Sequence, residues 1–88
     1  MKDRKFVIEP ELDVAVSQGG IKEVFISQTK NDGDDIEYIA SVQIKRSGDI
    51  LYLATRRKPN EARKFKSVDV AISALSKLIG AETFTVLL

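Results

Sequence analysis

The hydrophobic residues of this chain change their spacing part-way along it, and that change is the strongest constraint on the fold. Residues 36–45 alternate between the two faces of a half-buried strand, with a period of two. From Val68 to Ile79 the apolar residues instead recur at the i, i+3, i+4 and i+7 positions of a helix with one buried stripe. Strands followed by one helix predict an α+β domain.

The predicted helix over residues 68–79 has a characteristic residue at each end. Ser67 can cap its start, because a serine hydroxyl accepts a hydrogen bond from an otherwise unpaired backbone N–H. Asp69 suits the positive end of the helix dipole, and Lys77 suits the negative end. Gly80 follows at the position where helices commonly end in a left-handed residue.

A hairpin is predicted from residues 36–45, a turn at Ser47-Gly48 and a second strand over residues 50–55. With a two-residue turn, Arg46 would lie opposite Asp49 and Val42 opposite Leu53, which leaves one face of the hairpin apolar. The other face would then carry polar and charged groups and one aromatic ring, contributed by Ser41, Gln43, Lys45, Tyr52 and Arg56.

Further strands are predicted on both sides of this hairpin. Residues 24–30 form one, and a three-residue loop over residues 32–34 would direct Val24 and Ile26 to the core. A two-residue loop would direct Phe25 there instead, and we favour the first alternative. Two short strands at residues 6–8 and 12–16, and a last strand at residues 83–88, complete the pattern.

The expected architecture is therefore a single domain over residues 1–88 with an α+β fold. It consists of a small antiparallel β-meander of three to five strands, one α-helix in the C-terminal half packed on one face, and a final strand after the helix. No apolar run approaches the roughly 20 residues that cross a bilayer, and no signal peptide precedes Glu9. We expect no membrane partner and a cytoplasmic location.

The composition excludes much enzyme chemistry. The chain has no Cys and no His, so disulfides, zinc–thiolate sites, thiol nucleophiles and histidine bases are absent. Gly19-Gly20 lacks the flanking residues of a phosphate-binding loop. The acidic residues between 32 and 37 offer oxygen ligands, but they lack the spacing of a calcium loop and indicate a hairpin turn first. We expect no enzymatic activity, no metal and no cofactor.

The charges are segregated along the chain, although the formal net charge is only +1. Residues 45–66 hold eight Lys and Arg against two acids, a net charge of +6. Residues 9–37 hold eight acids against two Lys, a net charge of −6. Such segregation can steer an anionic partner to one face or join two copies of the chain, and it is also compatible with two solvated faces that bind nothing.

The basic run predicts a nucleic-acid interface. Five Lys and Arg fall within residues 56–64, around a Pro-Asn turn, and cations of this kind bind phosphates. The adjoining hairpin face would add a glutamine for base edges and a tyrosine for stacking. Phe65 is assigned to the core. The predicted contact residues are Gln43, Lys45, Arg46, Tyr52, Arg56, Arg57, Lys58, Arg63, Lys64 and Lys66.

The hairpin, the basic loop and the helix start Phe65-Lys66-Ser67, within residues 37–79, resemble in architecture a group of small DNA-binding domains. In these domains a three-stranded sheet backed by one helix enters a groove; the AP2 type and the arm-site-binding domains of phage-type integrases are examples. No diagnostic motif of either family is present, and no Trp matches the sheet-face tryptophan of the AP2 type. The resemblance implies DNA binding through the sheet.

The first expectation is thus a non-enzymatic nucleic-acid-binding module, with DNA as the ligand. The sequence does not show whether the ligand is DNA or RNA, or whether it is single-stranded or double-stranded. The alternative is a protein-interaction or homodimer module, based on the opposite charge runs and on the apolar tail from Phe84 to Leu88, which could pair at a sheet edge. A small-ligand binder or an enzyme using Asp, Lys or Tyr is the third class.

Overall fold

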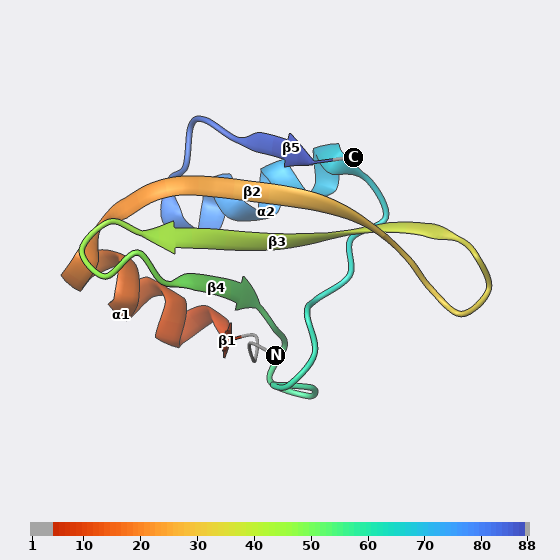
Figure 1. Ribbon diagram of the computed structural model, residues 1–88, viewed down its shortest axis with the longest axis horizontal. Coiled ribbons are helices and arrows are strands. Elements are labelled where there is room, and N and C mark those ends of the chain that lie inside the picture. Colours follow the sequence, from red (N-terminus) through yellow and green to blue (C-terminus); the bar gives the residue numbers. More distant parts are fainter. Residues whose placement is uncertain (1–4, 88) are drawn as a thin grey trace.

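The computed structural model describes residues 5–87, which form five strands and two helices (Figure 1). In chain order these are β1 (Lys5–Val7), α1 (Glu9–Gly19), β2 (Ile21–Lys30), β3 (Ile36–Ile44), β4 (Ile50–Leu53), α2 (Val68–Ile79) and β5 (Thr85–Leu87). The strands form one mixed sheet in the order β1-β4-β3-β2-β5. The predicted α+β fold is confirmed, with its main helix in the C-terminal half and a final strand after it.

Strands β2, β3 and β4 form the antiparallel meander that the alternating pattern predicts. The two outer strands are different, because β1 pairs with β4 and β5 pairs with β2 in parallel. A parallel pair cannot be closed by a tight turn, so long connections that contain the helices join the members of each pair. Residues 1–4, and Leu88 of the predicted last strand, lie outside the described part of the chain.

Helix α2 begins and ends where the sequence predicts. The Ser67 hydroxyl accepts a hydrogen bond from the backbone N–H of Val70 at 3.2 Å, and Gly80 is left-handed with φ of 66°. Phe65, just before the helix, is 2% exposed and exchanges two backbone hydrogen bonds with Tyr38 of β3. Its assignment to the core is confirmed. Neither helix within residues 5–87 has the length and apolar character to span a membrane.

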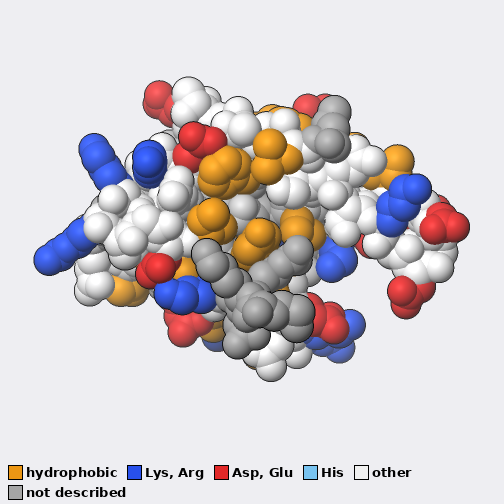
Figure 2. Space-filling model, in the orientation of Figure 1, with side chains coloured by type: hydrophobic (Ala, Val, Ile, Leu, Met, Phe, Trp, Pro, Cys, Tyr) orange, Lys and Arg blue, Asp and Glu red, His pale blue; other side chains and the backbone are white. Residues whose placement is uncertain are grey.

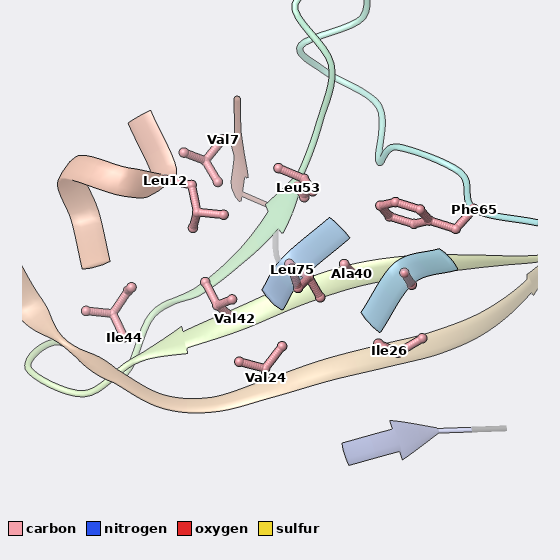
Figure 3. Packing of buried hydrophobic residues seen from close by; sticks show 11 residues of the cluster. Val7, Leu12, Val24, Ile26, Ala40, Val42, Ile44, Leu53, Phe65 and Leu75 are labelled. Atoms are coloured by element: carbon pink, nitrogen blue, oxygen red, sulfur yellow. The ribbon is translucent and has the colours of Figure 1, made fainter. Parts of the chain in front are cut away.

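The core lies between the sheet and the two helices, which cover the same face. Figure 3 shows Leu12 from α1 and Leu75 from α2 directed toward the sheet, where they join one buried cluster. Val24 and Ile26 of β2 belong to this cluster and are 4% and 0% exposed.

The loop after β2 contains three residues, 32–34. The backbone N–H of Asn31 donates to the carbonyl of Asp35 at 3.0 Å and closes this loop. The favoured loop length and core face are confirmed.

The predicted strand over residues 12–16 is wrong, because these residues lie in α1. Leu12, Val14 and Val16 fit a strand alternation, but Leu12, Ala15 and Val16 also have the i, i+3, i+4 spacing of a helix. The helical set packs on the core, whereas Val14 is 54% exposed. The proline ahead of them lies in the first turn of the helix, where its missing N–H removes no intrahelical hydrogen bond.

The predicted pairing of β3 with β4 is wrong by two residues. Val42 lies opposite Leu51 rather than Leu53, because the turn contains four residues, 45–48, instead of two. The last of them, Gly48, has a left-handed φ of 77°. A shift by an even number of residues leaves the same side chains on each face, so the predicted apolar face still meets the core.

Candidate nucleic-acid interface

Among residues 5–87, no helix or strand covers the face of the sheet opposite the helices, and this open face carries a row of aromatic side chains. Phe6 of β1 lies opposite Tyr52 of β4, Tyr52 opposite Ser41 of β3, and Ser41 opposite Phe25 of β2. Directly paired residues share a face, so these four positions cross the sheet in one line. All three aromatic residues are half-buried, and the ring centroids of Phe6 and Tyr52 are 6.1 Å apart.

Figure 2 shows this face, with hydrophobic side chains gathered in its middle and Lys and Arg side chains toward its ends and lower edge. Figure 1, in the same orientation, shows α2 behind the sheet. The centre of the open face is therefore apolar and aromatic, and its cations lie at the periphery.

The basic loop, residues 56–66, follows β4 and returns alongside the sheet. Ala62 forms a bridge with Ala54, just after β4, and Phe65 forms one with the start of β3. The end of the loop is thus inserted where β3 and β4 diverge. Because successive side chains of an extended segment alternate in direction, Phe65 enters the core while Lys64 lies on the open side, where it lines a groove.

Two cations of the basic loop are paired within the chain. Arg63 Nη1 lies 3.3 Å from Glu9 Oε1 at the start of α1, and its guanidinium lies 4.9 Å from the centroid of the Phe65 ring. Lys58 Nζ lies 3.7 Å from a carboxylate oxygen of Glu61, with both side chains exposed. Four loop cations form no ion pair with any residue between 5 and 87: Arg56, Arg57, Lys64 and Lys66.

Three of the predicted contact residues lie at the other end of β4. Lys45 and Arg46 are in the turn before this strand, whereas the basic loop follows it. At about 3.3 Å per residue, the six steps from 49 to 55 separate the two groups by about 20 Å. Gln43 is on the open face at the turn end, and its amide donates to a turn carbonyl at 3.3 Å. The prediction that Lys45 and Arg56 share the hairpin face is wrong, because both lie beyond the strand ends.

Two aromatic residues of the open face were missing from the predicted contact residues. Phe25 could have been found, because the three-residue loop that directs its neighbours to the core also directs Phe25 to the opposite face. Phe6 could not, since its place beside Tyr52 depends on the parallel pairing of β1 with β4. Ser41 lies on the predicted face but is only 4% exposed.

A groove of about 460 Å³ opens between the basic loop and the hairpin that joins β2 to β3. Its lining is apolar where it meets the sheet, at Phe6, Ile39 and Ala62. Both sides contribute a cation and an acid, which are Lys64 and Glu61 from the basic loop and Lys30 and Asp32 from the hairpin. The volume falls in the range of small-molecule pockets and can hold one nucleobase.

A surface ion pair connects β1 to the opposite end of the face. Lys5 Nζ lies 3.0 Å from Asp49 Oδ1, just before β4, and both side chains are largely exposed. The hydrogen bond from Lys5 lowers the pKa of the Asp49 carboxyl, and a hydrogen bond from Ser47 adds to this. The pair links an edge strand to the turn after β3.

The acidic turn between β2 and β3 is organised by its own side chains. Asn31 Oδ1 accepts hydrogen bonds from the backbone N–H groups of Gly33 at 2.8 Å and Asp35 at 3.0 Å. The acids of this turn are exposed, and the described residues 5–87 contain no group of three or more acidic, His or Cys side chains placed to hold a metal ion.

Comparisons of the chain with protein-family models, with curated proteins and with solved structures found no match. The meander of β2, β3 and β4 with α2 behind it is a three-stranded sheet backed by one helix, which is the arrangement on which the architectural resemblance is based. Strands β1 and β5 and helix α1 are additional elements. The features of the structure that bear on function are therefore the open face and the basic loop.

Proposed function

We propose that this chain is a non-enzymatic nucleic-acid-binding module that uses the basic loop and the adjoining open face of the sheet. The observation that supports this most is the set of four loop cations without an ion pair inside residues 5–87, one of which, Lys64, lines a groove together with Phe6 of the aromatic row. Cations bind phosphates and rings stack on bases, so the two kinds of group suit one ligand. DNA is the ligand tested first, and a cytoplasmic location is part of the proposal.

The number of loop cations without an ion pair inside residues 5–87 sets the expected salt dependence. If the four of them neutralise four phosphates, the logarithm of the binding constant falls against the logarithm of the salt concentration. The slope is about −4 on duplex DNA and about −3 on single strands. Binding that does not depend on salt would be incompatible with this mechanism.

Two double variants with the same change in net charge test the role of the basic loop. R56Q/R57Q removes two exposed loop cations, whereas K22Q/K77Q removes two exposed cations at the start of β2 and the end of α2. We expect R56Q/R57Q to bind about tenfold more weakly at 50 mM salt and to reduce the slope by about 1.5, with the control close to the parent protein. Equal losses in both variants would mean that net charge alone attracts DNA. Absence of binding by the parent protein would remove the proposal.

Self-association is a second candidate function, supported by the edge strand β5. Val86 and Leu87 are 39% and 49% exposed, and the outer side of β5 has no partner strand among residues 5–87. Exposed apolar edge strands can pair with a second copy of the chain. Light scattering of the parent protein and of Leu87→Ser at low and high salt tests this candidate. A monomeric parent protein under both conditions would exclude it.

A further inference from the structure

We propose that the bound nucleic acid is single-stranded, with bases stacked along Phe6, Tyr52 and Phe25 and one base inserted in the groove beside Lys64. This inference rests on the proposed function. It goes further in naming the form of the nucleic acid and the residues that distinguish this form from a duplex.

The aromatic row has the length of a short single strand. Its three rings lie on β1, β4 and β2, which are separated in total by three strand spacings of about 4.8 Å, or about 14 Å. Each ring can stack one base, so the row matches a segment of about three nucleotides. The base faces of a duplex are already stacked on each other, whereas a single strand exposes them to aromatic side chains. A row of rings on a sheet surface therefore favours the single strand.

The groove at the Phe6 end of the row suits a base better than a phosphate. Its lining contains two carboxylates as well as two ammonium groups, so it has no excess of positive charge that would select an anion. Carboxylates accept hydrogen bonds from base amino groups, and ammonium groups donate to base nitrogens and oxygens. The apolar surface of Phe6 and Ile39 can contact the base face. The phosphates then remain for the three loop cations outside the groove, Arg56, Arg57 and Lys66, so the expected salt slope on single strands is about −2 instead of about −3.

Intrinsic fluorescence tests stacking without disturbing the fold. The chain has two Tyr and no Trp, so its emission comes from Tyr38, which packs on the core, and Tyr52, which lies on the open face. A single-stranded 12-mer DNA and the duplex of the same sequence are titrated at 50 mM salt, with correction for nucleic-acid absorbance. We expect the single strand to quench the parent protein and Tyr38→Phe. Tyr52→Phe removes the emitting group on the open face, so the single strand should leave the remaining emission of this variant, which comes from Tyr38, unquenched.

A second experiment removes one ring at a time and measures binding by the anisotropy of a labelled 12-mer. Phe25→Leu keeps an apolar side chain on the open face and removes the stacking surface, so we expect at least fivefold weaker binding of the single strand. The matched control is Phe84→Leu, because Phe84 packs against the core from the helix side. This variant should bind within twofold of the parent protein.

The outcomes separate the inference from the proposed function. If single strand and duplex bind equally, or if Phe25→Leu binds like the parent, the inference is overturned. The proposed function would survive that result if R56Q/R57Q still weakened binding of both forms. If neither form binds, both proposals fail. Binding of the single strand to the parent protein without quenching of Tyr52 would also overturn the inference.

Discussion

Leu75 is, with Ala71, one of the two buried residues of α2, and it offers a direct test of the packing between the helix and the sheet. Its side chain is fully buried and is among the largest that are completely enclosed. Replacement by Ala removes three carbon atoms, each worth about 0.8 kcal/mol of transfer free energy. The cavity that remains adds about 1 kcal/mol, so Leu75→Ala is expected to lower the free energy of unfolding by about 3 kcal/mol.

The same helix supplies the control. Val70 is 50% exposed, and Val70→Ala is expected to change the free energy of unfolding by less than about 0.5 kcal/mol. Urea unfolding followed by circular dichroism measures both variants. With a slope of about 1.5 kcal/mol per molar urea, Leu75→Ala should unfold at a midpoint about 2 M below that of the parent protein.

Two results would refute the reasoning about this helix. The first is coincident unfolding midpoints for Leu75→Ala and Val70→Ala, because the exposed and the buried position would then be equivalent. The second concerns Leu75→Met, which nearly conserves volume and should cost less than about 1.5 kcal/mol. If the methionine variant were destabilised as much as the alanine variant, loss of packed volume would not be the cause.

Two smaller perturbations test the N-cap of α2 and the ion pair between Lys5 and Asp49. Ser67→Ala removes the N-cap of α2 and is expected to lower the free energy of unfolding by about 1 kcal/mol in the same urea assay. The control is Ser73→Ala, at an exposed position within the helix, which should have almost no effect. Equal losses of stability in the two variants would contradict the capping role. The pKa of Asp49 is lowered by its hydrogen bond to Lys5, so the pair stabilises the fold above the unfolded-state pKa of the carboxyl, and this contribution is lost as the pH falls through the lowered pKa. In Lys5→Gln, NMR titration should show the pKa of Asp49 closer to its ordinary value, and an unchanged pKa would mean that Lys5 is not the cause.

The sequence was sufficient where short-range patterns act alone. The boundaries of α2 follow from Ser67, Gly80 and the apolar spacing between them, because capping and helical periodicity involve residues only a few positions apart. The core faces of β2 and β3 followed from alternation and from the three-residue loop between them. Over residues 12–16 the pattern failed, since a segment of that length satisfies both the strand and the helix period.

The candidate site depended more strongly on tertiary structure. Lys45 and Arg46 lie before β4 and the basic loop follows it, so the length of this strand divides the predicted contact residues into two groups. The ion pair between Arg63 and Glu9 drew one loop cation to the helix side. The loop itself, and the excess of positive charge in it, were apparent from the sequence.

The local chemistry of the chain thus determined the strands of the meander, the helix α2 and the position of the cationic segment. The aromatic row was determined by the assembled sheet, because Phe6 reaches Tyr52 only through the parallel pairing of β1 with β4. That pairing is made by backbone N–H and C=O groups. Because these groups are the same in almost every residue, the pairing produces no local sequence pattern. The order of the strands, and with it the composition of the open face, was decided by how the helices and strands pack together to bury their apolar sides.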